Sequence, residues 1–392
     1  MLTVHVHLQE FMDSMPFADC LVTLQAHVVA GWLVPVEDAR SRPGSTSALR
    51  RSSPVVLEFD DDLAVDLQAQ ARTNALGEVT LELNLRDAFR EVRSQRHGDK
   101  PPTTVQGQLS ASADVHGLVL PARYRFEKLT KPDAELNLVL VADAARSIVG
   151  DTSATHTTLW FQLHAAPRQG DRLVCVLRPA PPGVERAVGL NFDAQRAHTA
   201  VTVFSGLTPE RAHEYELRLV QPDGAWYRLT RGSVRTLAAN PQRLTVAFAS
   251  CHLPDRPAAL GRWQALAERD DIDLAFLIGD QIYADGIEKL FGNASWNKRF
   301  ERRYNQLWTY QPMRRVLRSL PTYMALDDHE VADDWGTEEI DAEREAAGAN
   351  AYRVFQHAHN PIGFGATFLD YSFRRGPAAF YVTDSRTARG GE

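Results

Sequence analysis

The hydrophobic pattern changes at Pro241, and this change constrains the fold more than any other feature of the sequence. Before Pro241, short runs alternate apolar and polar residues between turn residues, as at Val79, Leu81 and Leu83. Alternation puts the apolar side chains on one face of a strand, which is typical of antiparallel sheets. After Pro241, continuous apolar runs at 244–250 and 274–279 flank a segment with helical spacing. Such runs are typical of parallel strands covered on both faces.

These patterns predict a multidomain chain. We expect a β-rich module of unknown role at 1–141, a second β-rich block at 142–241, and an α/β layer at 242–392. In the second block, the segment 206–217 resembles the corner of fibronectin type III or immunoglobulin-like β-sandwiches. That resemblance implies that Tyr215 ties the corner, and the alternative is a tyrosine on a half-buried strand.

Composition excludes several classes of protein. The 392 residues carry a net charge of -7, which argues against nucleic acid as a partner except as a phosphodiester substrate. Three distant cysteines, Cys20, Cys175 and Cys251, predict neither a disulfide framework nor a paired-cysteine metal site. The sequence shows no export signal and no apolar run long enough for a membrane span. We therefore expect a cytoplasmic protein with no membrane partner.

Chemically active residues follow three successive apolar runs. Cys251 follows the first run, Asp280 and Tyr283 follow the second, and Asp328 and His329 follow a third at 321–326. Because the carboxyl ends of parallel strands meet at one edge of a sheet, these groups should converge. Thiol, carboxylate, phenol and imidazole groups bind metal ions, so the sequence predicts a metal site there.

Each piece has a plainer interpretation when taken alone. A single cysteine after a buried strand is often a small core residue, and Gly279-Asp280 is a common turn sequence. Asp327 to Glu330 can be a solvated acidic loop or a helix N-cap. The coincidence of all three at successive strand ends favours the metal site.

The same segments resemble the PhoD-like metallophosphatases, also called alkaline phosphatase D. The motifs are Ala249-Ser-Cys-His, Leu277-Ile-Gly-Asp-Gln-Ile-Tyr-Ala-Asp, Met324-Ala-Leu-Asp-Asp-His-Glu and Phe380-Tyr-Val-Thr-Asp-Ser-Arg. The resemblance covers roughly 142–392 and includes the block that ends at Gly232-Ser-Val-Arg-Thr. It implies N-terminal β-sandwich modules followed by a partial α/β metallophosphatase-like domain of four layers, αββα.

The resemblance also implies a role for each residue. Cys251 corresponds to a thiolate ligand of ferric iron, Tyr283 to its phenolate ligand, and Asp280 to the carboxylate that bridges two metals. Asp328 corresponds to a ligand of the second metal, calcium in this family, with other divalent metals as alternatives. His329 corresponds to the histidine that contacts phosphate and protonates the leaving group.

A basic segment follows the second motif. Between Trp296 and Ser319, Arg and Lys residues outnumber the one acid, Glu301, and Arg302 and Arg303 are candidates for binding substrate phosphate. The alternative is a solvated helix face.

The resemblance implies a phosphoesterase that hydrolyses phosphate mono- or diesters by attack of a metal-bridging hydroxide. Its substrate is a small phosphate ester. Members of the family continue into a Gly-Asp-x-His-like motif that adds metal ligands, and this sequence ends at Glu392 before such a motif. The second hypothesis is therefore a non-catalytic β-sandwich binding or scaffold protein with an inactive phosphatase remnant. The sequence predicts neither the natural substrate nor the oligomeric state.

Overall fold

The computed structural model describes most of the chain. The described residues are 2–10, 20–35, 55–75, 78–83, 104–115, 118–129, 134–142, 144–180, 183–251, 257–308, 310–336, 340–363, 369–387 and 389. The chain divides into two compact units, Met1–Asp143 and Ala144–Glu392. The predicted boundary near residue 141 lies close to this division, and the predicted boundary at 241–242 falls inside the second unit. The division into three domains stays a prediction.

The first unit is built from strands. They are β1 (Leu2–Glu10), β2 (Leu21–Pro35), β3 (Val55–Arg72), β4 (Glu78–Leu83), β5 (Thr104–Val115), β6 (Leu118–Leu129) and β7 (Ala134–Ala142). One sheet has the order β4-β1-β7, with β1 and β7 parallel, and the other is antiparallel with the order β3-β2-β5-β6. The alternation at Val79 to Leu83 forms β4, whose Leu81 and Leu83 are buried.

The second unit begins with two antiparallel sheets. Their strands are β8 (Ala145–Thr152), β9 (His156–Leu163), β10 (Arg172–Ala180), β11 (Arg186–Leu190), β12 (Thr199–Ser205), β13 (Ala212–Val220) and β14 (Trp226–Arg235), with the 3-10 turn η1 (Ala194–Arg196) before β12. The sheet orders are β11-β10-β13-β14 and β12-β9-β8. Trp160, Phe161 and Tyr215 are fully buried between these sheets and their neighbours.

The rest of the second unit is an α/β layer. Its strands are β15 (Val246–Ala249), β16 (Leu274–Ile278) and β17 (Thr322–Ala325), followed by the hairpin β18 (Tyr371–Arg375) and β19 (Ala378–Val382). Its helices are α2 (Pro257–Ala267), α3 (Ile287–Phe291), α4 (Trp296–Leu307), α5 (Gln311–Leu317) and α6 (Ala342–Phe355), with 3-10 turns η2 (Asp328–Glu330) and η3 (His357–His359). The sheet β15-β16-β17 is parallel throughout, as the continuous apolar runs predict.

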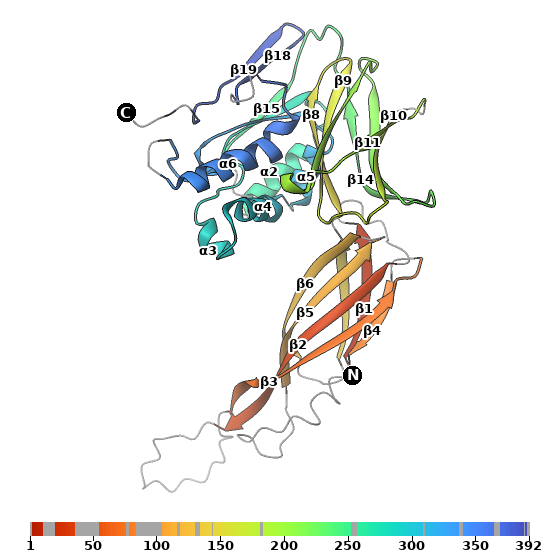
Figure 1. Cartoon of the computed structure of the whole chain (residues 1–392), viewed down its shortest axis with the longest axis vertical. Coiled ribbons are helices and arrows are strands. Elements are labelled where there is room, and N and C mark those ends of the chain that lie inside the picture. Colours follow the sequence, from red (N-terminus) through yellow and green to blue (C-terminus); the bar gives the residue numbers. More distant parts are fainter. Residues whose placement is uncertain are drawn as a thin grey trace. The chain divides into compact units, whose positions relative to one another are not determined.

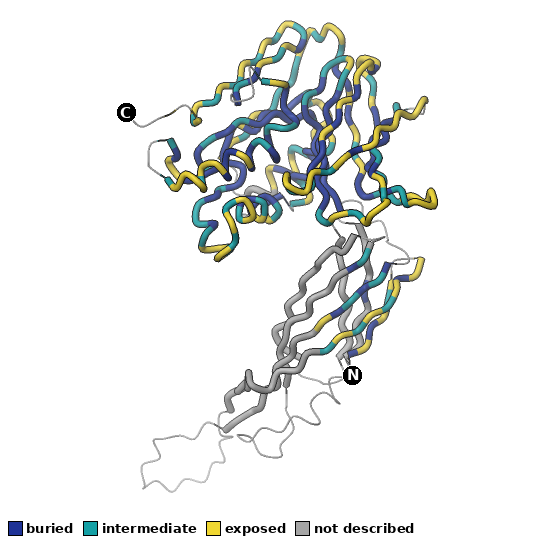
Figure 2. Tube along the Cα trace, viewed as in Figure 1, coloured by how far each residue is buried: buried dark blue, intermediate teal, exposed yellow. Residues whose placement is uncertain are grey.

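The parallel sheet has a different partner on each face. Side chains alternate along a strand, so Leu277 and Met324 pack with α4, α5 and α6, while Phe276 and Tyr323 face the β18–β19 hairpin. Figure 1 shows the sheet between these helices and the hairpin. Figure 2 shows that buried residues run through the centre of this unit. Packing on both faces therefore fixes β16 and β17, and the candidate ligands follow the carboxyl ends of these strands.

The antiparallel sheets are tied to the α/β layer by specific hydrogen bonds. Trp160 Nε1 donates to the Val354 carbonyl oxygen at 2.8 Å, and an Arg314 guanidinium nitrogen donates to the Ala145 carbonyl oxygen at 2.9 Å. These bonds join segments far apart in the sequence, which explains why residues 144–392 form one compact unit.

Tyr215 contributes a tie of the same kind. Its hydroxyl lies 2.9 Å from Ser147 Oγ and donates to the Arg318 carbonyl oxygen at 2.9 Å. Gly232 leaves the space for this contact, because a Cβ there would collide with the Tyr215 ring and the Arg318 oxygen. Tyr215 therefore reaches beyond its own sheet to the chain after α5.

Replacing Tyr215 with Phe should lower the free energy of unfolding by about 1–2 kcal/mol, because buried acceptors lose their donor without a change in packing volume. Urea denaturation of the two proteins measures the difference. The exposed Tyr381→Phe serves as the control, and an unchanged stability of Tyr215→Phe would contradict the proposed importance of this tie.

Candidate metal centre

The carboxyl ends of β15, β16 and β17 place the predicted ligands at one edge of the sheet. The register pairs Ala249 with Leu277 and Ile278 with Ala325, so the three strands end almost level. The chain that leaves each strand carries a candidate group within a few residues. The three strands thus end beside one another as the sequence predicts, and the ligand roles of the groups that follow them stay predictions.

Three of the candidate ligands have unusual backbone conformations. Cys251, Asp280 and Tyr283 adopt positive φ angles of 52°, 58° and 44°. Non-glycine residues seldom adopt such angles, and those that do are concentrated at functional sites. Gly279, with φ of 95°, is needed before Asp280 because a Cβ there would collide with Asp327 Cβ. The loops after β15 and β16 thus hold these three side chains in defined directions.

The Asp280 carboxylate lies at the centre of the site. Cys251 Sγ donates to its Oδ2 at 3.3 Å. Its Oδ1 is buried and has no hydrogen-bond partner among the described residues. Burial raises the pKa of Asp280, and the negative charges of Asp327 and Asp328 raise it further. The hydrogen bond from Cys251 and the charge of His329 lower the pKa, but by less. A buried carboxylate oxygen without a donor is expensive, and a cation would compensate it.

Asp280 and its neighbours satisfy a distance condition for a shared metal ion. Ligand atoms of Asp280, Asp328 and His329 all lie within 4.8 Å of one another. Oxygen and imidazole nitrogen atoms at this spacing suit a hard or borderline cation. The residues present therefore fit a metal centre.

His329 is oriented by an acid that the sequence analysis did not single out. Asp285 Oδ2 lies 2.7 Å from His329 Nδ1, and Asp285 Oδ1 accepts a hydrogen bond from the Asp333 backbone N–H at 2.6 Å. Burial lowers the pKa of His329, but the charges of Asp285, Asp280 and Asp328 outweigh it and raise that pKa above its ordinary value. The Nε2 atom lies 3.7 Å from Oδ1 of the exposed Asp333.

Tyr283 lies against the same imidazole. The two ring centroids are 4.4 Å apart. Burial raises the pKa of Tyr283 to about 12, and the negative charge of Asp280 adds to the effect. The phenol therefore stays protonated at neutral pH unless a strongly charged cation replaces its proton.

Asp328 is held by the chain that follows β19. Arg386 donates to Asp327 Oδ1 at 2.6 Å and to Asp328 Oδ1 at 3.1 Å. The backbone N–H of Asp334 donates to Asp328 Oδ2 at 2.9 Å. Although burial alone would raise the pKa of Asp328, the Asp334 N–H and Arg386 lower it below its ordinary value. Asp328 is therefore an anion that could act as a ligand.

Glu330 organises the backbone beneath the site. This fully buried carboxylate accepts hydrogen bonds from the backbone N–H groups of Gln281 at 2.6 Å, Asp280 at 2.9 Å and Asp327 at 3.0 Å. Burial raises its pKa to about 7 in spite of these donors. Asp327 also caps η2 through a capping box with Glu330. The N-cap interpretation of this segment is thus correct for Asp327.

The two arginines predicted to bind substrate differ from each other. Arg302 is exposed on α4. Arg303 is buried, and its Nε donates to the carbonyl oxygens of Ile282 at 2.7 Å and Tyr283 at 3.1 Å. These contacts give Arg303 a positioning role for the Tyr283 loop. The substrate-binding role of both residues stays a prediction.

Sequence reasoning missed Asp285, Glu330 and Arg386. The first two have a signal in the sequence, since Asp285 lies two residues after Tyr283 and Glu330 directly follows His329. Arg386 closes the motif that follows β19, and it contacts Asp327 and Asp328, nearly 60 residues earlier in the chain. The sequence motif alone does not reveal that pairing.

Comparison with known proteins relates the chain to phosphatases. Residues 246–392 match the family model described as PhoD-like phosphatase. The structure of PhoD matches with a TM-score of 0.50 and 20% identity, covering 62% of this chain and 51% of that chain. The structure of purple acid phosphatase PPD1 from yellow lupin (Lupinus luteus) seeds matches with a TM-score of 0.49 and 14% identity, covering 98% and 68%. No curated protein matches this sequence.

The match to the family model and the likeness of the fold to PhoD support a metallophosphatase-like domain in this part of the chain. The match to the PhoD-like phosphatase model supports an assignment of residues 246–392 to that family. The chain spans about half the length of the PhoD structure that it matches. Among the described residues, no helix has both the length and the apolar character needed to cross a bilayer.

Proposed function

We propose that this protein is a metal-dependent phosphoesterase that acts on phosphate mono- or diesters. The observation that carries the proposal is the convergence of Cys251, Asp280 and His329 from three strand ends, with one Asp280 oxygen buried and unpaired. The match of residues 246–392 to the PhoD-like phosphatase model supports the same reaction class. A phosphate ester is therefore the substrate class, and nucleic acid enters only as a phosphodiester substrate.

The donor set supports ferric iron as one metal, and the family resemblance suggests calcium as the second. Cys251 and Tyr283 would supply thiolate and phenolate ligands, which need a highly charged cation to remain anionic at neutral pH. Asp280 would bridge the two ions, and Asp328 would hold the second. Bound metal ions supply Lewis acidity, which neutralises phosphoryl charge and lowers the pKa of coordinated water.

The protein's own residues would orient the substrate and move its proton. Asp285 holds Nδ1 of His329, and Nε2, which lies 3.7 Å from the exposed Asp333 carboxylate, would contact a phosphoryl oxygen and protonate the leaving group. Glu330 and Arg303 fix the backbone that carries Asp280 and Tyr283. The reacting groups would thus be held in place before the substrate binds.

The antiparallel sheets before this domain support a finer structural proposal. The Phe161 and Tyr215 rings belong to different sheets and contact each other at 5.9 Å between centroids. We infer that residues 145–235 form a β-sandwich, and that the sheet, hairpin and helices after it are layers of an αββα domain.

The test of the proposed function is an assay with p-nitrophenyl phosphate and bis(p-nitrophenyl) phosphate. The chain is first stripped with a chelator and then reloaded with ferric iron and calcium. Turnover that returns only on reloading would support the proposal. Absence of turnover with either ester, in a reloaded chain shown to contain both metals, would refute it.

Replacing Asp285 with Asn should shift the pH dependence of that activity. His329 must be protonated to act as the acid, so activity falls as pH rises through its pKa. Asp285 raises this pKa, and its neutral replacement should therefore move the alkaline limb of the kcat profile to lower pH. A profile of kcat against pH for the two proteins checks the direction, and a limb that stays in place would contradict the role of Asp285.

A further inference from the structure

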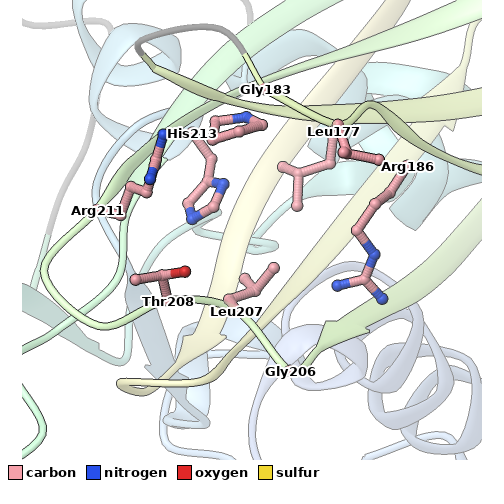
Figure 3. Close-up of a pocket in the computed structure, with 10 residues that line it drawn as sticks. Leu177, Gly183, Arg186, Gly206, Leu207, Thr208, Arg211 and His213 are labelled. Carbon is pink, nitrogen blue, oxygen red and sulfur yellow. The ribbon is translucent and has the colours of Figure 1, made fainter.

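A second candidate site lies within the antiparallel sheets of the second unit. A cavity of about 250 Å³ opens between the end of β10, the start of β11, the segment 206–208 and the start of β13. Figure 3 shows the residues that form it, including Leu177, Arg186, Leu207, Thr208, Arg211 and His213. None of them belongs to the candidate metal centre.

The cavity combines positive charge with apolar surface. Arg186 and Arg211 line it together with the Thr208 hydroxyl, and none of the described residues that line it is acidic. Leu177 and Leu207 form its apolar part. The Arg186 guanidinium uses one nitrogen to donate to the Ser205 carbonyl oxygen at 2.6 Å, which fixes its direction at the rim. Guanidinium groups recognise carboxylate and phosphoryl oxygens.

His213 supplies an unsatisfied polar group beside these arginines. The residue is only 5% exposed, and its Nε2 is buried without a hydrogen-bond partner among the described residues. In Figure 3 the imidazole lies between Arg211 and Leu177, above Thr208 and Leu207. Burial lowers the pKa of His213, and the charges of Arg211 and Arg186 lower it further. Buried polar groups are normally paired, so a ring nitrogen left unpaired here indicates a missing partner.

The loop that carries Leu207, Thr208 and Arg211 is fixed by hydrogen bonds to the chain after β14. Thr236 Oγ1 donates to the Thr208 carbonyl oxygen at 2.6 Å and accepts from the Arg211 backbone N–H at 2.9 Å. The Glu210 backbone N–H donates to the Leu237 carbonyl oxygen at 3.1 Å. A cavity whose walls are already fixed loses little conformational entropy when a ligand binds.

We propose that this cavity binds a small organic anion, in which a carboxylate or phosphoryl group is joined to a short apolar group. The anionic group contacts Arg186, Arg211 and His213, and the apolar group lies against Leu177 and Leu207. The volume is below the usual range for drug-sized ligands, so the ligand has few non-hydrogen atoms. Binding here is independent of the proposed phosphoesterase activity.

The test uses the full chain with its metals removed by a chelator, so that the metal centre does not recruit the probe. Phenylphosphonate, which has no hydrolysable ester bond, is titrated while the backbone amide resonances are followed by NMR. The expected result is saturable shifts at Leu207, Thr208 and His213. Separate Arg186→Gln and Arg211→Gln variants should each weaken binding by about tenfold or more.

Arg172→Gln is the matched control, because it removes the same charge from the opposite, exposed end of β10. Its affinity should equal that of the unmodified chain, and thermal unfolding shows that all variants fold. Inorganic phosphate has only the anionic group, and benzyl alcohol has only the apolar group. Each should bind at least about tenfold more weakly than phenylphosphonate. No shifts at the cavity, equal affinity in all variants, or equal affinity for either partial probe would overturn the proposal.

Discussion

Replacing Asp280 with Asn should reduce phosphoesterase turnover by roughly 10³-fold or more, because the residue is expected to bridge both metals. The change removes one charge and keeps the shape of the side chain. Asn also tolerates the positive φ of 58° at this position. The metal-free protein should therefore remain folded, which circular dichroism and urea denaturation can check.

The exposed Asp270→Asn provides a matched control for Asp280→Asn, since it removes the same charge from the loop before β16. Its turnover should equal that of the unmodified protein. Retained turnover in a folded, metal-loaded Asp280→Asn protein would refute the bridging role. Lost turnover together with an unfolded chain would refute the expectation that the loop tolerates Asn.

Replacing Glu330 with Gln should destabilise the chain by about 2–4 kcal/mol, the largest stability effect expected here. The two carboxylate oxygens together accept three backbone N–H groups. A Gln side chain has only one acceptor oxygen, so its NH₂ group must face at least one of these donors inside the protein. Because the raised pKa of Glu330 is about 7, the comparison is made at pH 8, where the carboxylate is ionised.

Urea denaturation measures the effect of Glu330→Gln, and Glu301→Gln is the control. Glu301 pairs with Lys298 at 2.7 Å near the surface of α4, where such a pair contributes about 0–1 kcal/mol. Equal stability of Glu330→Gln and the unmodified protein would show that the backbone around Asp280 does not depend on this carboxylate.

The fold after Pro241 was predictable because local pattern and tertiary environment agree there. Continuous apolar runs predicted β15 and β16, and the helical spacing of Leu260, Trp263 and Leu266 predicted the helix α2 between them. The placement of Cys251, Asp280 and His329 after three neighbouring strands also followed from the apolar runs, and their role as a metal site stays a prediction. These inferences need only the rule that parallel strands end at one edge of their sheet.

Contacts between distant segments were not predictable from local pattern. The sequence shows Tyr215 on a strand, but its partner is the Arg318 carbonyl oxygen, 103 residues later. Arg303 looked like a surface cation, and the structure buries it against the carbonyl oxygens of Ile282 and Tyr283. A backbone acceptor has no sequence signature, so only the folded chain reveals such roles.

The cavity beside His213 was missed for a similar reason. Its lining comes from β10, β11, β13 and the loop before β13, and no short motif joins them. The sequence analysis interpreted this block only as a structural module. The roles of its charged residues depend on how three strands and a loop meet.

The most direct measurement of the central claim is the metal content of the chain after exposure to ferric iron and calcium, followed by removal of loosely bound ions. We predict about one ferric ion per chain with a visible charge-transfer band from its thiolate or phenolate ligands. The Tyr283→Phe variant should change this band, and Asp280→Asn should lose metal. A metal-free chain, or metal binding that is identical in Asp280→Asn, would contradict the account.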